Sequence, residues 1–202
     1  MNWEVILAPY VQVVGELKVK LKGMRTQFEF ESRHSPIEFI TARVKPIASI
    51  LEKAEKRKIP LNEIEKEIQD IAGVRVVCPF VDDIYSVVQM LQSRSDFNIL
   101  EEKDYINDKK RSGYRSYHMT IEYPVETIHG RKIVLAEIQI RTLAMNFWAI
   151  NEHSLNYKYQ GRIPKEIEKR LQLAAEAAFN LDEEMSKIRN EIHEAKRMFH
   201  RL

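Results

Sequence analysis

The sequence contains a single cysteine and no long run of apolar residues. Cys78 is the one cysteine among 202 residues, so no internal disulfide can form, and its place in the apolar run 76–78 is typical of a small buried hydrophobe. No apolar stretch approaches the roughly 20 residues that span a bilayer, and the N-terminus lacks the basic segment that begins a signal peptide. We therefore expect a cytoplasmic protein with no membrane contact.

The chain also lacks an excess of charge of one sign and a glycine-rich phosphate loop. It has 32 basic and 30 acidic residues, a net charge of +2, so any basic site must be local. The pattern G-x-x-x-x-G-K-[ST] is absent, which excludes a Walker-type ATPase and predicts that phosphates are held by side chains and metal. The remaining composition, 44% apolar and 31% charged, is ordinary for a globular protein with one sizeable core.

Hydrophobic periodicity predicts helices at both ends of the chain and a mixed sheet between them. The expected helices cover residues 3–28, a segment opened by Pro46, residues 62–69, a segment opened by 82–83, and the sequence after 142 with a break near 161–164. The expected strands cover 73–78, 97–103, 117–123 and 133–141, the last two joined as an antiparallel hairpin. A capping box at 35–38 predicts a further helical turn or a short strand.

We expect one domain over residues 1–202, with an N-terminal helix at 1–34, a catalytic core at 35–160 and a C-terminal helix at 161–202. Apolar side chains recur along the last helix beyond the length that a small sheet can cover. They are Leu171, Ala174, Ala178, Leu181, Met185, Ile188 and Ile192. Self-association would bury this stripe, so the terminal helices are expected to serve oligomerisation.

The stretch 137–141 alternates polar and apolar residues. On a strand, Glu137, Gln139 and Arg141 would share one face, although such a run by itself also fits a half-buried strand with a solvated side. A second acid, Asp70, stands at the mouth of another predicted strand. Two carboxylates from neighbouring strands can hold Mg²⁺, which prefers oxygen ligands and completes its shell with water and substrate phosphates. The pattern therefore indicates a metal and nucleotide site.

Cations and an aromatic group accompany these acids. Arg43, Lys45, Lys53 and Arg75 can converge on phosphates, and Arg75 lies within an apolar strand, where an unpaired guanidinium is costly and requires a carboxylate or phosphate partner. If a strand begins near the turn at Gly113, then Tyr114, Ser116 and His118 share a face and offer a ring for base stacking. A single tyrosine or histidine of this kind is also common in ordinary packing.

Several long motifs in this order resemble the RelA/SpoT synthetase domain. They are RVKP at 43–46, DIAGVR at 70–75, GYRSYH at 113–118, EIQIRT at 137–142 and AMNFWA at 144–149. The likeness runs through nearly the whole chain and is to the small alarmone synthetases of the RelQ type. It implies an α+β fold, a mixed nucleotidyltransferase-like sheet flanked by helices, and transfer of the β,γ-pyrophosphoryl group of ATP to the 3′-hydroxyl of GDP or GTP. The products would be ppGpp and pppGpp.

The resemblance also implies roles for particular residues. Asp70 and Glu137 would bind Mg²⁺, and Glu137 would also act as the base towards the 3′-hydroxyl. Tyr114 would stack on guanine. The ATP-binding positions would be Arg43, Lys45, Ser49, Lys53 and Arg75. The GTP- or GDP-binding positions would be Lys110, Tyr114, Arg115, His118, Gln139 and Asn146.

RelQ-type members assemble as homotetramers whose central cleft can bind a guanosine tetra- or pentaphosphate. The matching candidates for this allosteric site are Lys22, Arg25, Glu38, Phe39 and Thr41. The hydrolase and ribosome-sensing regions of the long family members have no counterpart in this sequence, so neither activity is expected.

Two other functions fit parts of the pattern. A nucleotidyltransferase would attach AMP to an acceptor and release pyrophosphate from the same kind of acidic site. A binding module would hold single-stranded RNA on the basic helices and use the acids structurally, and RNA could also act as a regulator. The preferred acceptor among GMP, GDP and GTP stays open.

Overall fold

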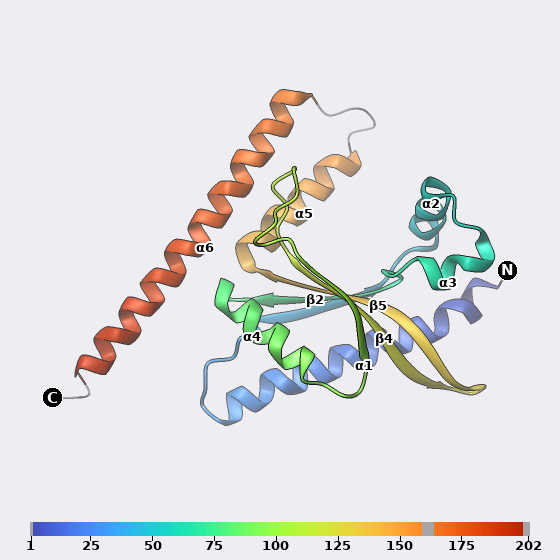
Figure 1. Ribbon diagram of the computed structural model, residues 1–202, viewed down its shortest axis with the longest axis horizontal. Helices are drawn as coiled ribbons and strands as arrows, with labels where there is room; N and C mark the ends of the chain where they lie inside the picture. The colour runs from blue at the N-terminus through green and yellow to red at the C-terminus, as the bar shows by residue number, and fades with distance from the viewer. Residues whose placement is uncertain (1, 159–163, 200–202) are drawn as a thin grey trace.

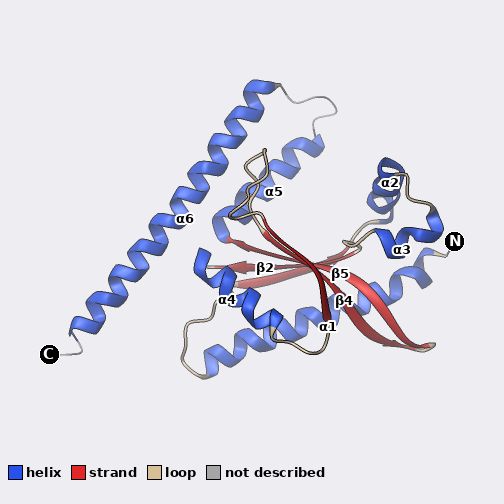
Figure 2. Ribbon diagram, in the orientation of Figure 1, coloured by secondary structure: helices blue, strands red, loops and turns tan. Residues whose placement is uncertain are grey.

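A five-stranded mixed sheet lies at the centre of the structure and carries helices at its faces and ends (Figures 1 and 2). This computed structural model describes residues 2–158 and 164–199. The strands are β1 (Phe39–Val44), β2 (Ala72–Cys78), β3 (Asn98–Asp104), β4 (Tyr117–Thr127) and β5 (Gly130–Thr142). Their order is β1-β2-β5-β4-β3, with β2 and β5 parallel and every other pair antiparallel. The predicted α+β class and mixed sheet are confirmed.

The helices agree closely with the hydrophobic periodicity. They are α1 (Trp3–Phe30), α2 (Ile47–Arg57), a 3-10 turn (Leu61–Glu63), α3 (Ile64–Glu67), α4 (Val81–Gln92), α5 (Leu143–Lys158) and α6 (Lys165–Phe199). Of the break expected near 161–164, residues 161–163 lie outside the described part of the chain. No helix in the described residues is both long and apolar enough to cross a membrane.

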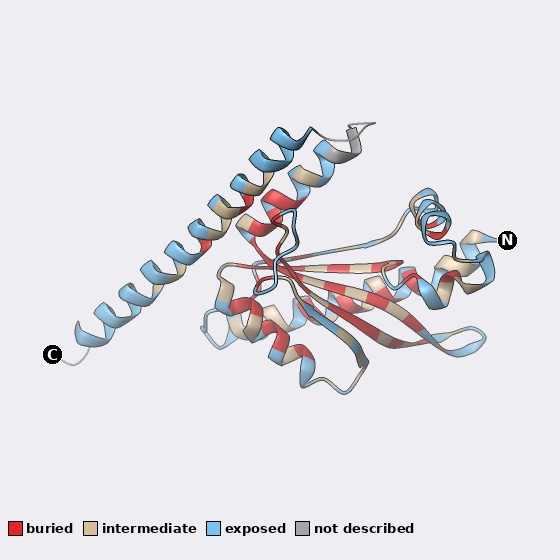
Figure 3. Cartoon of the chain, turned by 45° about the horizontal axis from the view of Figure 1, so that its top comes forward, coloured by how far each residue is buried: buried red, intermediate tan, exposed pale blue. Residues whose placement is uncertain are grey.

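The two faces of the sheet differ in chemistry because side chains alternate along each strand. Val74, Val76, Ile138 and Ile140 are fully buried and pack with α1 and α4 in one apolar core (Figure 3). Helix α1 contributes residues at helical spacing to that core, namely Tyr10, Val13, Leu17 and Leu21. The opposite face of β1, β2, β4 and β5 is polar, and this face carries the acids and cations predicted from the sequence.

The capping box expected at 35–38 is wrong. Ser35 Oγ accepts a hydrogen bond from the amide of Ile37 at 3.2 Å, which makes a local turn outside any helix. The Glu38 amide donates to the carbonyl of Val77 at 2.8 Å and so starts the pairing of β1 with β2. Sheet pairing therefore outweighs the local helix signal, and the short strand, the other expected outcome, forms.

Candidate active site

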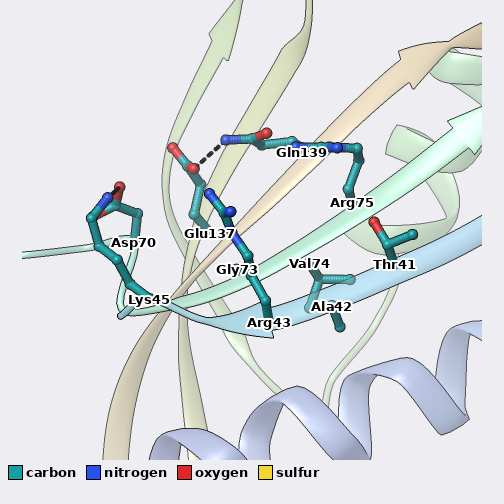
Figure 4. A pocket seen from close by; sticks show the side chains of 10 residues that line it. All are labelled: Thr41, Ala42, Arg43, Lys45, Asp70, Gly73, Val74, Arg75, Glu137 and Gln139. Atoms are coloured by element: carbon teal, nitrogen blue, oxygen red, sulfur yellow. Dashed lines mark hydrogen bonds and ion pairs between the residues drawn. The ribbon is translucent and has the colours of Figure 1, made fainter. Parts of the chain in front are cut away.

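The two predicted acids line a single pocket on the polar face of the sheet (Figure 4). Strands β2 and β5 are parallel neighbours, with Gly73 opposite Glu137 in register, and Asp70 lies just before β2 at the same edge. This strand pairing brings Asp70 and Glu137 close together although they are far apart in the sequence. The pocket is lined by Thr41, Ala42, Arg43, Lys45, Asp70, Gly73, Val74, Arg75, Glu137 and Gln139.

Asp70 is held by two lysines. Lys45 Nζ, just after β1, lies 2.7 Å from one carboxylate oxygen, and Lys53 Nζ, on α2, lies 2.8 Å from the other. Burial alone would raise the pKa of Asp70, but the hydrogen bonds and charges of the lysines outweigh it and lower that pKa below its ordinary value. The carboxylate is therefore ionised at neutral pH.

Glu137 is oriented by neighbours on the sheet. His118 Nδ1 lies 3.0 Å from one of its oxygens, and Gln139 Nε2 donates to the other at 2.6 Å. Burial opposes ionisation of Glu137, yet the hydrogen bonds from His118 and Gln139 prevail and lower its pKa. Because an ionised carboxylate only accepts hydrogen bonds, His118 carries its proton on Nδ1 in this contact.

A second pocket adjoins the first and contains the predicted stacking residue. It is lined by Arg43, Arg75, Lys110, Tyr114, Gln139, Arg141, Ala149, Ile150, Glu152 and His153. Three of these residues, Arg43, Arg75 and Gln139, also line the first pocket. The structure thus brings a site with acids and lysines directly beside a site with an aromatic ring and cations.

Tyr114 stands in a loop and not on a strand, because β4 begins only at Tyr117. Its hydroxyl lies 2.7 Å from His118 Nε2, and the ammonium of Lys110 lies 5.0 Å from the centre of its ring. Ser116 is fully buried beside them, where its hydroxyl donates to the carbonyl of Ile140 at 3.2 Å and accepts from Arg141 Nε at 3.2 Å.

Arg141 lines the second pocket, although the sequence analysis, which placed it on the same face as Glu137 and Gln139, gave it no binding role. It is buried and donates to Tyr114 Oη and to Gln139 Oε1, each at 2.6 Å. The alternation of Glu137, Gln139 and Arg141 on one face was the signal that could have identified it.

Arg75 lies between the two pockets without a partner among the described residues. Its Nε is buried and makes no hydrogen bond, and the neighbouring charges are those of Arg141 and Arg43. Burial is the largest cause that lowers the pKa of Arg75, followed by these two cations. The described residues do not provide the carboxylate that the sequence led us to expect as one of two possible partners.

Five predicted nucleotide-binding residues line neither pocket, and two of them, Lys53 and His118, contact the acids that do. The other three lie further away from both pockets. Ser49 on α2 and Asn146 on α5 line neither of them, and the side-chain oxygen of Asn146 is buried without a partner. Arg115 is buried against α6, where its guanidinium lies 3.9 Å from the centre of the Phe179 ring. Arg115 is therefore turned towards α6 and does not line the second pocket.

The candidate allosteric residues lie near the junction of α1 and β1. Arg25 donates to the backbone carbonyl of Glu38 and pairs with Glu29 at 2.9 Å, while Lys22 is exposed. Phe39 is half-buried, and Thr41 lines the first pocket. The structure therefore brings Arg25 and Glu38 together beside the edge strand of the sheet.

Comparison with known proteins gives a family. The family described as "Region found in RelA / SpoT proteins" matches residues 42–162. This chain belongs to the RelA/SpoT family. The RelA/SpoT chain is 62% identical over 200 residues to the GTP pyrophosphokinase YjbM of Bacillus subtilis, covering 99% of this chain and 94% of that protein. The resemblance inferred from the motifs is confirmed.

Solved structures of small alarmone synthetase 1 from Bacillus subtilis resemble this RelA/SpoT chain over nearly their full length. The structure bound to its product pppGpp has a TM-score of 0.92 at 62% identity, covering 95% of this chain and 98% of that one. The structure bound to AMPCPP has a TM-score of 0.85 at 58% identity, covering 96% and 98%.

Proposed function

We propose that this protein is a GTP/GDP pyrophosphokinase, which transfers the β,γ-pyrophosphoryl group of ATP to the 3′-hydroxyl of GDP or GTP. The observation that carries the proposal is the adjoining pair of pockets, one with two ionised acids and the other with Tyr114. Two nucleotides must meet in such a reaction, and two connected pockets provide for both. The pppGpp and AMPCPP bound to the relative's structures support this assignment.

The first pocket suits the triphosphate of ATP. Arg43, Lys45 and Arg75 line it, and Lys53 reaches it through Asp70. Phosphoryl-type transfer depends on cations placed where negative charge develops. A phosphate beside Arg75 would also satisfy its unpartnered Nε and relieve the repulsion from Arg43 and Arg141.

The donor set in this pocket fits Mg²⁺. The described residues contain no cluster of three or more histidine, cysteine or acidic side chains of the kind that encloses a metal. Mg²⁺ instead is usually held by one or two carboxylates together with substrate phosphates, and Asp70 and Glu137 line the same pocket. When bound there, the ion would neutralise charge on the transferred group.

Glu137 is the proposed general base. It would accept the proton of the 3′-hydroxyl while that oxygen forms a bond to the β-phosphorus of ATP and the bond to the α-phosphate oxygen breaks, releasing AMP. His118 and Gln139 hold the two carboxylate oxygens, which fixes the direction in which Glu137 presents its lone pairs. Asp70 lies in the same pocket and is the proposed second metal ligand.

The second pocket would take the guanosine nucleotide. Tyr114 offers its ring to the base, and Lys110, His118 and Gln139 surround it with polar groups. Roles for Arg115, Asn146 and Ser49 rest on the family resemblance, since these three residues do not line the pockets.

The test is incubation of the protein with Mg²⁺, γ-labelled ATP and each of GMP, GDP and GTP, followed by separation of products by charge. Pyrophosphoryl transfer moves the label to the guanosine nucleotide and shows the preferred acceptor at once. Label released as pyrophosphate, with AMP joined to an acceptor, would instead establish a nucleotidyltransferase. Salt-dependent affinity for single-stranded RNA without turnover would establish the binding module.

We further propose a cytoplasmic homotetramer regulated by (p)ppGpp at the junction of α1 and β1, with single-stranded RNA as a second regulator to be tested. Lys22, Arg25, Glu38, Phe39 and Thr41 are the proposed contacts. Product added at micromolar concentration should raise the initial rate, and Lys22→Ala should abolish that rise. An unchanged rate in the wild type would refute the regulatory site without affecting the proposed reaction.

A further inference from the structure

The loop that carries Tyr114 and Lys110 lies outside the sheet. It connects β3 to β4, and its own backbone closes it, with the amide of Gly113 donating to Lys110 at 2.8 Å and the amide of Lys110 donating to Tyr114 at 3.2 Å. On the side of the sheet, the hydroxyl of Tyr114 contacts His118 and Arg141. The turn before Tyr114 extends beyond the strands and is supported by a second element.

Helix α6 holds it through polar contacts. Gln172 Nε2 donates to the backbone carbonyl of Arg111 at 2.8 Å. One turn further along α6, the carboxylate of Glu176 pairs with the ammonium of Lys109 and, at 3.2 Å, with the guanidinium of Arg115. Both ends of the turn are thus tied to one face of the helix.

Steric fit brings the helix and the loop into close contact. Gly113 has a φ of +90°, and a Cβ built at this position would lie 2.6 Å from Cβ of Ala175, which real Cβ atoms do not tolerate. Ala175 is buried in a small apolar cluster with Trp148, and Tyr114 packs against that cluster. Because Gly113 has no Cβ and Ala175 carries only a methyl group, α6 can pack directly against the turn.

Arg115 couples the helix to the tyrosine next to it. Its guanidinium is buried over the ring of Phe179, and two of its nitrogens have no partner. Tyr114 lines the acceptor pocket while Arg115 faces α6, so neighbouring side chains point to opposite sides of the loop. The contact of Arg115 with α6 therefore restrains the backbone that also carries Tyr114.

We propose that α6 positions the acceptor nucleotide through this loop, with Glu176 and Phe179 as positioning residues for the guanosine base. The proposal rests on the function proposed above. Lys45, Lys53 and Asp70, which serve the ATP pocket, stand outside this loop on or beside β1, α2 and β2. Loosening the contact with α6 therefore weakens binding of the guanosine nucleotide and leaves binding of ATP unchanged.

The experiment compares Michaelis constants in Glu176→Lys, in the charge swap Glu176→Lys with Lys109→Glu, and in the matched control Glu183→Lys. Glu183 lies two turns further along α6 and is exposed. Loss of both ion pairs of Glu176 and the new repulsion from Lys109 and Arg115 should raise KM for GDP by roughly fivefold in Glu176→Lys, with KM for ATP unchanged. The charge swap restores the pair with residue 109 but not the pair with Arg115, so it should recover part of the loss, and the control should match the wild type.

Hydrogen exchange of the amides in 109–115 provides a readout independent of catalysis. Faster exchange in Glu176→Lys than in Glu183→Lys supports the contact even if the wild type transfers no pyrophosphoryl group, a result that would refute only the proposed function. If the wild type is active and KM for GDP is unchanged in Glu176→Lys, or if both KM values rise together, α6 does not position the acceptor.

Discussion

At the scale of single residues, the charged side chains of the first pocket affect the stability of the protein in opposite directions. The two acids are ionised because cations and hydrogen bonds overcome their burial, whereas Arg75 is buried among like charges. Ionisation of the acids therefore stabilises the free protein, and the buried arginine destabilises it, a cost that the proposed phosphate ligand would offset.

Glu137→Gln should lower kcat by roughly 10²- to 10⁴-fold, because the amide keeps the shape of the side chain but cannot accept the proton. The fold should be preserved, with a modest fall in melting temperature, because the hydrogen bonds of His118 and Gln139 to the ionised carboxylate are weakened. Steady-state product formation measures the loss, with Glu126→Gln as a control, since Glu126 is exposed at the end of the β4–β5 hairpin. Near-normal turnover of Glu137→Gln would remove the assigned base.

Arg75→Met should make the free protein more stable and the enzyme less effective. Removal of a buried guanidinium with an unsatisfied Nε should raise the free energy of unfolding by about 1 kcal/mol. Loss of charge-assisted bonds to phosphate should raise KM for ATP by roughly tenfold or more. Thermal unfolding without nucleotide and initial rates at varied ATP test the two effects, and a lower melting temperature would show that Arg75 has a stabilising partner.

The residue pattern predicted the ladder of Glu137, Gln139 and Arg141 because alternation along a strand needs only local sequence. It could not place Arg115, since the turn at Gly113 has a positive φ and turns this side chain onto α6. Ser35 gave a helix signal that pairing of β1 with β2 overrode. Signals that depend on one element were reliable, and those that depend on where a distant element packs were not.

At the scale of elements, the contact of α6 with the end of β5 depends on pH. Asp182 on α6 is 6% exposed and accepts a hydrogen bond from Thr142 Oγ1 at 2.5 Å, while Thr142 itself accepts from the amide of Met145 near the start of α5. Burial raises the pKa of Asp182 to about 6, against the smaller opposing effect of the bond from Thr142. The folded state thus binds this proton more tightly than the unfolded state.

Stability should therefore fall as pH rises from the ordinary pKa of Asp182, 3.8, to about 6, and the loss should persist above that. Asp182→Asn should remove the penalty and stabilise the protein by up to about 3 kcal/mol at pH 7.5, with no advantage near pH 4. Melting temperatures across this pH range test the difference. An advantage of equal size at both pH values would assign the effect to packing instead of charge.

Asp70 and Glu137 affect the pH dependence of stability in the opposite direction from Asp182, because folding lowers their pKa values. Their contribution to stability is complete above the ordinary carboxylate range and is lost as pH falls through the lowered values. Periodicity predicted the strands that carry these acids. The pairing of β2 with β5, which brings Glu137 to the edge beside Asp70, joins segments far apart in sequence, so the residue pattern allowed neighbouring strands as a hypothesis but could not give their parallel register.

At the scale of the whole molecule, the outer part of α6 projects from the sheet domain with little cover (Figures 1 and 3). Leu181, Met185, Ile188 and Ile192 are spaced on one face and are between 40% and 57% exposed. Such a continuous apolar stripe is costly in water and typical of an interface. The sequence predicted this stripe correctly, but a single chain does not show what covers it.

Ile188→Glu combined with Ile192→Glu should reduce the molar mass measured by light scattering from that of a tetramer to a smaller species, because charges would face each other at the buried stripe. Glu194→Gln, an exposed change on the same helix, serves as the control. A tetramer that persists in the double variant would place the interface elsewhere.

The hydrogen bonds around Glu137 all run in one direction. Arg141 only donates and Glu137 only accepts, and two parallel routes join them, one through Tyr114 and His118 and the other through Gln139. The amide orientation of Gln139 and the tautomer of His118 are consequently fixed from both ends of the circuit, by a guanidinium that must donate and by a carboxylate that must accept. Replacing Arg141 with a neutral residue would leave Glu137 as the only fixed end and would remove the donor to Tyr114 Oη and to Gln139 Oε1, so a position that makes no contact with the proposed catalytic carboxylate helps to hold its two partners in place.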